Sequence, residues 1–405
     1  MFPDTSRPFA FEDQAAWART DDALSAAENR MAEDVKQAFA AGRALLPLGG
    51  GSLPGAGNLS TRPTAPLCTD ALGGMIELDA ANQYFTAGAG TTLAAVQEAL
   101  APHNQWLPLR PAYGLLRRTL GGITATGALG PERIAYGAPR ELLLGLRFID
   151  GRGRLINTGG KVVKNVAGYD TTRLVAGSAG TLGLITRVTM KTATRPQRCA
   201  VISACGVPEA CAGLARQVLG SSLGAVFAAA APDDGGESWR LQVGFEGFDE
   251  TVAAQLDRAE ALFGKSDFRS ARVEDYDVLT GPFAGLYDRI AGCRFVLRAG
   301  APPDRAGQAA AVLQQQARVE ALMVDFGSGR VLAGSREVGD ESWREIGRRL
   351  RELAGHAVLE KCPDEFKTRN DVFGSPRPEW NLMHRVKNIF DPKHIFAPGR
   401  MPGKV

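Results

Sequence analysis

Residues 159–186 read GGKVVKNVAGYDTTRLVAGSAGTLGLIT, and the architecture of the chain is best understood from this stretch outward. It holds six glycines (159, 160, 168, 177, 180 and 183) in 28 residues, with apolar residues between them. A flexible linker would instead be polar and without pattern. Glycine spaced through an apolar segment permits positive φ or a close approach to the backbone. The stretch therefore indicates either a backbone site for a flat or phosphate-bearing ligand or a structural turn between strands.

Composition indicates a globular protein of two or three domains. The chain has 405 residues, of which 44% are hydrophobic and 22% charged, and its formal net charge is +3. This small net charge does not indicate a nucleic-acid-binding protein. Asp4, Glu12 and Asp13 argue against a signal peptide. The uncharged run 44–61 contains too many glycines and prolines for a spanning helix, so we expect no transmembrane segment. We also expect reduced cysteines and hence a cytoplasmic location.

The cysteines give no metal motif. The six lie at positions 68, 199, 205, 211, 293 and 362, and none forms a C-x-x-C pair. Zinc and iron–sulfur sites normally use closer pairs. We therefore expect reduced structural thiols and no metal site.

Hydrophobic periodicity predicts an α+β first region ending near residue 198. A helix is expected over 21–42, followed by the strand 44–48 that runs into a glycine loop. Asp150-Gly151 predicts a hairpin between flanking apolar runs. Further strands are expected at 75–79, 83–87, 142–149, 154–158 and 182–191, and a further short helix, capped by Thr91, at 92–100.

The pattern changes beyond residue 198. Strand and helix signals over 200–273 follow the order βαββαβ, and the same order recurs over 293–362. Two such units in tandem predict a mainly antiparallel sheet with helices on one face. The predicted domains are 1–198, 199–377 and a tail, 378–405, that returns to the first domain.

Glycine-rich segments at 49–57, 119–130 and 159–183 offer bare backbone N–H groups of the kind that bind a pyrophosphate. Arg133, Lys161 and Lys164 are candidates to neutralise the phosphate charge. The loops at 49–54 and 88–93 lack the third glycine of a Rossmann fingerprint, and neither has the Gly-Lys-Ser/Thr of a P-loop.

Several motifs, in this order, resemble the flavoproteins with a vanillyl-alcohol-oxidase (PCMH-type) FAD-binding domain and, among them, the FAD-binding subunits of bacterial glycolate oxidases. The resemblance covers about residues 30–200 and the last twenty residues, and is weak over 200–380. The segments that carry it are Gly49-Gly50-Gly51-Ser52, Thr119-Leu120-Gly121-Gly122, Gly130-Pro131-Glu132-Arg133 with Tyr136-Gly137, Lys161 to Asp170, Gly180-Thr181-Leu182-Gly183, and Phe390-Asp391-Pro392 with Phe396 to Arg400.

The resemblance implies an α+β fold in which a two-subdomain PCMH-type domain binds FAD beneath an α+β cap domain, here the tandem βαββαβ sheet. It places the pyrophosphate on the backbone of 49–53 and 119–126. The segments 164–170 and 177–185 would line the adenine and ribitol side. The implied FAD-binding residues are Gly49, Gly50, Gly51, Ser52, Leu53, Pro111, Thr119, Leu120, Gly121, Gly122, Ala125, Thr126, Gly130, Arg133, Lys164, Asn165, Gly168, Tyr169, Asp170, Gly177, Ser178, Thr181, Gly183 and Ile185.

Three departures from the family pattern qualify this resemblance. Many relatives tether the flavin through a histidine of the first glycine loop, but this loop reads Gly51-Ser52, which implies noncovalent FAD. The four histidines (103, 356, 384 and 394) do not form the metal-binding motif that stand-alone 2-hydroxy-acid dehydrogenases carry in the cap. Ala397 stands where relatives commonly have an asparagine. Arg110, Arg294 and Arg369 could each clamp a carboxylate, and no catalytic base is marked.

The sequence thus favours an FAD-dependent oxidoreductase subunit of a glycolate-oxidising complex. By resemblance, its partners would be a homologous flavin subunit that carries the hydroxy-acid site and an iron–sulfur subunit, and they could bring it to the inner face of a membrane. Two alternatives stay open: a self-sufficient FAD-linked oxidase of a hydroxy acid or sugar acid, and a non-catalytic scaffold whose flavin is structural.

Overall fold

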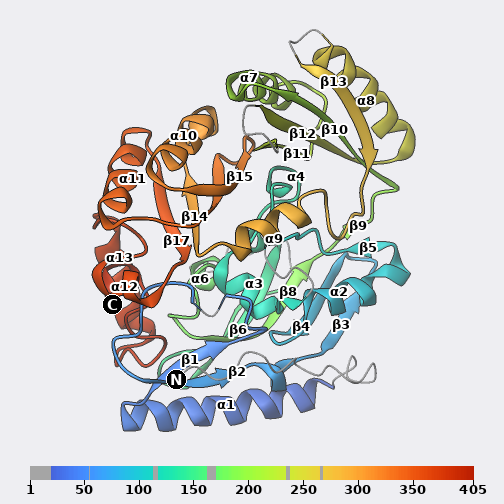
Figure 1. The fold of residues 1–405 in the computed structure, drawn as a ribbon. Coiled ribbons are helices and arrows are strands. Elements are labelled where there is room, and N and C mark those ends of the chain that lie inside the picture. The colour runs from blue at the N-terminus through green and yellow to red at the C-terminus, as the bar shows by residue number, and fades with distance from the viewer. Residues whose placement is uncertain (1–19, 54, 113–116, 162–169, 234–237, 265–267) are drawn as a thin grey trace. The chain divides into compact units, whose positions relative to one another are not determined.

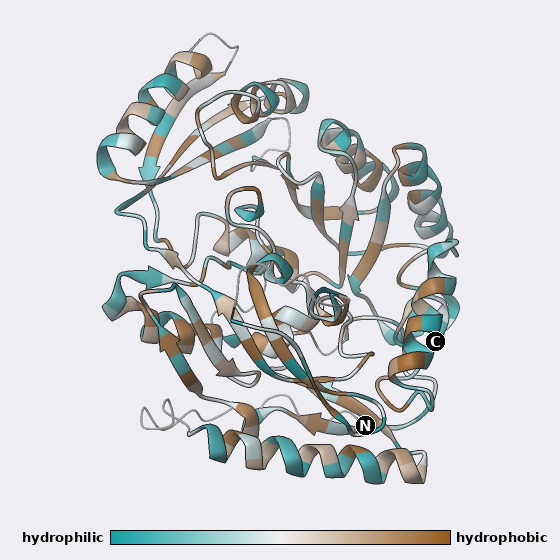
Figure 2. Cartoon of the chain, turned by 180° about the vertical axis from the view of Figure 1, so that it is seen from behind, coloured by the Kyte–Doolittle hydropathy of each residue, from teal (hydrophilic) through white to brown (hydrophobic). Residues whose placement is uncertain are grey.

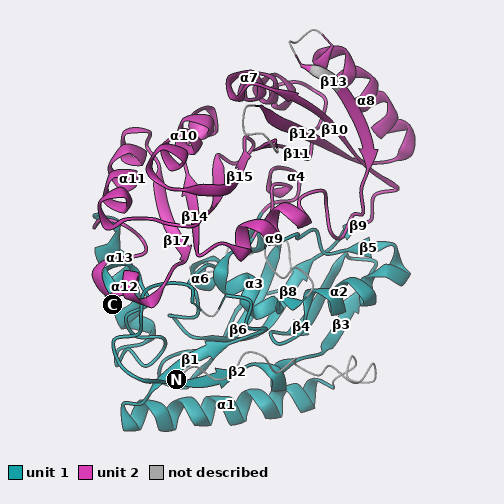
Figure 3. Ribbon diagram, viewed as in Figure 1, with its two compact units in different colours: residues 1–128, 138–194, 377–405 teal, residues 129–137, 195–376 magenta. Residues whose placement is uncertain are grey.

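The computed structural model describes residues 20–405 except 54, 113–116, 162–169, 234–237 and 265–267. The chain divides into two compact units, coloured separately in Figure 3. Unit 1 comprises residues 1–128, 138–194 and 377–405, and unit 2 comprises residues 129–137 and 195–376. The tail thus lies in the same unit as the first 128 residues, while the short segment 129–137 belongs to the unit formed by the middle of the chain.

Unit 1 is built around a five-stranded antiparallel sheet of order β3-β4-β8-β6-β7 (Figure 1). A second, two-stranded sheet pairs β1 with β2 in parallel. The strands of unit 1 are β1 (Ala44–Leu48), β2 (Thr64–Cys68), β3 (Met75–Asp79), β4 (Tyr84–Gly88), β5 (Gln105–Trp106), β6 (Leu143–Ile149), β7 (Leu155–Gly159), β8 (Leu184–Lys191) and β9 (Ala193–Thr194). Its α-helices are α1 (Asp21–Ala41), α2 (Leu93–Leu100), α3 (Leu120–Thr126), α5 (Pro139–Leu142), α6 (Thr171–Val175) and α13 (Glu379–Phe390).

Helix α1 shows how the predicted periodicity becomes packing. Its apolar face, which includes Leu24, Met31 and Val35, is buried, and Figure 2 shows polar residues on the rest of the helix. Thr20 caps the first turn, and Gly42 ends the helix at φ +65°, a conformation that favours glycine. The predicted helix over 21–42 is confirmed.

Unit 2 contains one eight-stranded sheet of order β13-β10-β12-β11-β15-β16-β14-β17, and all of its strand pairs are antiparallel. Its strands are β10 (Arg198–Gly206), β11 (Phe227–Pro232), β12 (Trp239–Gly247), β13 (Arg269–Asp275), β14 (Phe295–Gly300), β15 (Val319–Asp325), β16 (Arg330–Ser335) and β17 (His356–Lys361). Its α-helices are α4 (Arg133–Tyr136), α7 (Pro208–Leu219), α8 (Asp249–Phe263), α9 (Ala284–Gly292), α10 (Ala306–Gln316), α11 (Asp340–Glu352) and α12 (Asp364–Arg369).

The tandem βαββαβ prediction is confirmed by this sheet. Each half has its last strand beside its first, and the two halves meet where β11 pairs with β15. Helices α7, α8, α10 and α11 share one apolar core with one face of the sheet. The prediction of helices on one face alone was wrong, because α9 packs on the opposite face, where a Cβ at Gly334 would meet Ile290 and Cys293.

Several short elements of unit 1 were missed. Helix α3 lies in the glycine-rich segment 119–130, for which no helix was predicted, because Gly121 and Gly122 lower helix propensity. Thr119 nevertheless caps it by accepting a hydrogen bond from Gly122 N at 3.2 Å. The predicted cap of α2, Thr91, is also wrong: Thr92 makes that bond, to Ala95 N, while Thr91 bonds to Gly74.

Candidate functional site

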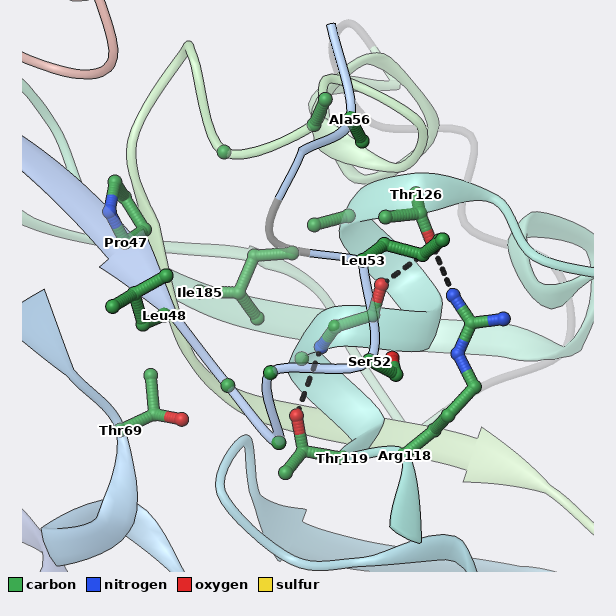
Figure 4. A pocket seen from close by; sticks show the side chains of 18 of the residues that line it. Pro47, Leu48, Ser52, Leu53, Ala56, Thr69, Arg118, Thr119, Thr126 and Ile185 are labelled. Carbon is green, nitrogen blue, oxygen red and sulfur yellow. Dashed lines mark hydrogen bonds between the residues drawn. The ribbon is translucent and has the colours of Figure 1, made fainter. Parts of the chain in front are cut away.

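Unit 1 contains a cavity where three glycine-rich segments meet (Figure 4). About 840 Å³ of space, part of it open to solvent, is enclosed by this cavity. Its described lining consists of Pro47, Leu48, Gly49, Gly50, Gly51, Ser52, Leu53, Ala56, Thr69, Arg118, Thr119, Gly121, Gly122, Ala125, Thr126, Ala179, Gly180, Gly183, Leu184, Ile185 and Arg400.

The first segment of the lining follows directly from β1. Strand β1 ends at Leu48, and the loop that follows passes very close to the start of α3. A Cβ at Gly49 would lie 2.4 Å from Thr119 Oγ1, and one at Gly50 would lie 2.4 Å from the carbonyl oxygen of Arg117. These two glycines are therefore required by the contact between two chain segments, whatever ligand the cavity holds.

Other glycines face open space. Gly51 has φ +66° and no atom of the described residues within 4 Å of a virtual Cβ, and among these residues a Cβ at Gly122 would meet only Thr119 Oγ1, at 3.1 Å. A side chain at Gly122 would therefore enter the cavity. These positions form a cradle with bare backbone, as a bulky phosphate-bearing ligand needs.

Electrostatics favour an anion in this cavity. Arg118 and Arg400 line it, and none of the described lining residues is acidic. Arg118 donates to the Ala112 carbonyl at 2.8 Å and to Thr126 Oγ1 at 3.2 Å, as Figure 4 shows for Thr126. Arg400 donates to the carbonyl of Ala56, and burial lowers the pKa of its guanidinium. Two guanidinium groups thus contribute positive charge to a largely apolar wall.

A hydroxyl group is also available for a ligand. Thr69 is 6% exposed, and its Oγ1 has no hydrogen-bond partner among the described residues. Figure 4 shows this oxygen turned toward the glycine loop. A buried hydroxyl normally has a partner, so the position suits a polar ligand atom. The glycine cradle, the two arginines and this hydroxyl fit the pyrophosphate and ribityl hydroxyls of FAD.

The structure brings together about half of the FAD-binding residues expected from the sequence. Those that line the cavity are Gly49, Gly50, Gly51, Ser52, Leu53, Thr119, Gly121, Gly122, Ala125, Thr126, Gly183 and Ile185. Lys164, Asn165, Gly168 and Tyr169 lie outside the described residues.

Other expected residues have different positions. Gly130 and Arg133 belong to unit 2. Leu120 is part of the apolar core of unit 1, and Pro111 is buried outside the lining. Asp170 caps α6 by accepting from Arg173 N at 3.0 Å.

Three more expected residues, which are not lining residues themselves, belong to the 177–183 loop, of which Ala179, Gly180 and Gly183 line the cavity. Gly177 N donates to the Thr124 carbonyl, and Thr181 Oγ1 donates to the Ser178 carbonyl. The expected phosphate partner Lys161 forms an ion pair with Glu77 at 2.6 Å and is not among the lining residues. Arg118, Arg400 and Thr69 were missed, since no local motif distinguishes them from the many other arginines and threonines.

All six cysteines are free thiols. Among the described residues, no group of three or more His, Cys, Asp or Glu side chains could hold a metal ion. No helix in the described part of the chain is both long and apolar enough to span a membrane.

Together, the fold and the cavity define a flavoprotein with a PCMH-type FAD-binding fold. Residues 24–159 match the family described as FAD binding domain, and residues 375–401 match the family described as FAD linked oxidases, C-terminal domain. Two parts of the chain are thus similar to FAD-linked oxidases, and FAD is its cofactor.

Curated relatives carry names from hydroxy-acid oxidation. The chain is 41% identical over 124 residues to glycolate oxidase subunit GlcE of Escherichia coli, a match that covers 31% of this chain and 35% of that protein. It is 27% identical over 392 residues to D-lactate dehydrogenase of Archaeoglobus fulgidus, covering 88% of this chain and 85% of that one. Glycolate oxidase subunit GlcD of Bacillus subtilis is 31% identical over 153 residues, a match that covers 38% of this chain and 32% of that protein. Thus the matches to the two glycolate oxidase subunits span about a third of those proteins.

A solved structure supports the fold across nearly the whole chain. Alkyldihydroxyacetonephosphate synthase superimposes with a TM-score of 0.65 at 16% identity, over 92% of this chain and 75% of that one. At this identity the likeness concerns the fold alone. The prediction of an α+β PCMH-type fold is confirmed.

Proposed function

We propose that this chain is an FAD-binding subunit of a complex that oxidises a small 2-hydroxy acid of the glycolate type, and that it binds FAD without a covalent bond. The observation that carries the proposal is the 41% identity to a protein named as a glycolate oxidase subunit. A second flavin subunit and an iron–sulfur subunit would complete the complex, and the name of the GlcD relative supports the first of these.

The cavity supports noncovalent binding. Among the described residues of its lining there is no histidine or cysteine to which a flavin could be tethered. Bound FAD supplies the redox chemistry by accepting electrons from a donor. The chain's own residues would hold it: backbone around Gly51 and Gly122 faces the ligand, and Arg118 and Arg400 balance the pyrophosphate charge.

A second candidate function has its own support. The D-lactate dehydrogenase relative aligns over 88% of this chain, so a self-sufficient FAD-linked dehydrogenase of a 2-hydroxy acid is the alternative. The described residues offer no cluster of three metal-ligating side chains, which favours the subunit over a metal-assisted enzyme.

Two measurements on the purified chain test these proposals. Acid precipitation should leave the flavin in the supernatant, whereas flavin that precipitates with the protein would refute noncovalent binding. Under anaerobic conditions, glycolate and D-lactate should each leave the flavin absorbance of the isolated chain unchanged. Rapid bleaching by either acid would instead support the self-sufficient enzyme.

A further inference from the structure

Helix α13 carries a lysine whose charge is completely buried. Lys387 has 0% exposed side chain, and its ammonium donates to three oxygens: the Thr181 carbonyl at 2.6 Å, Asp391 Oδ2 at 2.7 Å and the Phe396 carbonyl at 2.8 Å. An ammonium group has three N–H donors, so all three are used. Burial lowers the pKa of Lys387, and the charge of Asp391 opposes this shift. A buried charge persists only when it is paired and hydrogen-bonded in this way.

The partner Asp391 organises the tail. Its side chain is also 0% exposed, and it accepts hydrogen bonds from Ile395 N at 2.9 Å and Phe396 N at 2.7 Å. The tail then runs beside β1: Leu45 N donates to the Ile395 carbonyl at 2.6 Å, and Ala397 N to the Leu45 carbonyl at 2.8 Å. Because β1 leads into the glycine loop, this tail supports one wall of the cavity.

The Thr181 carbonyl belongs to a second wall. Gly180 and Gly183, on either side of Thr181, both line the cavity. On its other side this loop is bonded to α3, where Ala179 N donates to the Ala125 carbonyl at 2.6 Å. The loop is therefore held between α3 and the Lys387 ammonium. The bond from Lys387 to the Thr181 carbonyl has a charged donor, and such bonds are stronger than those between neutral groups.

We propose that Lys387 is a positioning residue of the flavin site: its ammonium fixes the Thr181 carbonyl and so sets the position of the Gly180–Gly183 wall. Lys387 acts through the loop and is not itself among the lining residues. The proposal rests on FAD occupying this cavity. A competing explanation is that the ion pair merely anchors the tail and has no particular effect on the flavin.

The first experiment replaces the ammonium with an uncharged chain of similar length. Lys387→Met should raise the Kd for FAD at least tenfold, measured by flavin fluorescence titration of the apoprotein, because the loop wall loses its charged anchor. Val35→Ala is the matched control: it removes buried volume from α1 in the same unit, outside the cavity lining. It should lower the unfolding temperature and leave the Kd for FAD unchanged.

A double variant separates the two explanations. Lys387→Met alone leaves the Asp391 carboxylate buried without its cation, which is strongly destabilising. Lys387→Met/Asp391→Asn removes that charge and keeps one amide oxygen, which can accept from one of the two tail N–H groups, Ile395 N or Phe396 N. We expect this double variant to recover part of the lost stability but to keep the weakened FAD binding, because the Thr181 carbonyl still lacks its donor.

The results that would overturn the proposal follow from this design. An unchanged Kd in either variant, or a double variant that regains wild-type affinity together with stability, would reduce Lys387 to a tail anchor. If Lys387→Met does not fold, the Kd for FAD of the double variant alone tests the proposal. Failure of the wild-type chain to bind FAD would contradict the assignment of the cavity itself and is distinguishable from both.

Discussion

The cavity of unit 1 and the polar face of the unit 2 sheet use charge in opposite ways. In the cavity, Arg118 and Arg400 bond to neutral oxygens, and the described lining contains no acidic residue. On the sheet of unit 2, Glu360 pairs with Arg298 at 2.6 Å and with Arg330 at 3.5 Å. Positive charge thus lines the cavity, whereas Arg298, Arg330 and Glu360 of unit 2 form ion pairs with one another.

Two tyrosines of unit 2 also bind a charged side chain of the same unit. Glu246 accepts hydrogen bonds from Tyr136 at 2.8 Å and from Tyr276 at 2.5 Å. Tyr136 comes from segment 129–137. In the same segment, Ile134 packs against Gly327, and the Leu129 carbonyl accepts a hydrogen bond from Arg330. These groups bind a chain segment of their own unit. The comparison therefore predicts that cavity variants change FAD affinity and that unit 2 variants change stability alone.

The largest effect should come from filling the cradle. Gly122→Arg should abolish FAD binding, because any side chain at this position enters the cavity, and arginine is a better helix former than glycine. Flavin content after purification and titration of the apoprotein measure this. The matched control is Gly213→Arg in α7 of unit 2, another helical glycine with nothing within 4 Å of its virtual Cβ. Retention of FAD by the Gly122 variant at wild-type affinity would show that the pyrophosphate lies elsewhere.

A smaller loss should follow from removing one cavity charge. Arg400→Met should raise the Kd for FAD about 100-fold, corresponding to about 2.7 kcal/mol, since a partly buried guanidinium–phosphate contact is lost. It should also weaken the dependence of FAD affinity on salt, while Arg400→Lys should retain most of that dependence.

Arg62→Met is the control for the role of Arg400 in tail packing. Arg62 holds the tail through the carbonyls of Lys393 at 3.0 Å and His394 at 2.6 Å and is not among the lining residues. If Arg62→Met weakens FAD binding as much as Arg400→Met, the effect arises from the tail and not from the cavity charge.

A change at the buried carboxylate of unit 2, Asp325, should have no effect on FAD binding. Asp325 is 1% exposed and accepts from Gly327 N at 2.9 Å and from Ser328 Oγ in the β15–β16 turn. Burial raises the pKa of Asp325 to about 6. Because the unfolded chain releases this proton at lower pH than the folded chain, the native protein loses stability as pH rises from about 4 to about 6.

Asp325→Asn removes this titration and keeps an acceptor for Gly327 N. The unfolding free energy of the wild type, minus that of this variant, should therefore fall by about 2 kcal/mol as the pH rises from about 4 to about 6. Urea denaturation of both proteins at each pH measures this difference. The Kd for FAD should stay at the wild-type value. A pH-independent difference would place the Asp325 pKa near its ordinary value, and altered FAD affinity would contradict the separation of roles between the units.

The sequence alone determined the local elements and the class of cofactor. Helix 21–42, the Asp150-Gly151 hairpin and the βαββαβ repeats follow from hydrophobic periods and turn residues, which act between near neighbours. Twelve of the expected FAD-binding residues line the cavity because their glycine-rich segments are recognisable without knowledge of the fold.

Tertiary structure decided which charges reach the cavity and what holds its walls. The bond from Lys387 to Thr181 spans 206 positions, and that from Arg400 to Ala56 spans 344. No periodicity or motif marks such pairs, because their bonds exist only after distant segments pack. The same reason explains why Lys161 was expected at the phosphate but pairs with Glu77, and why segment 129–137 was assigned to the first domain although it packs in unit 2.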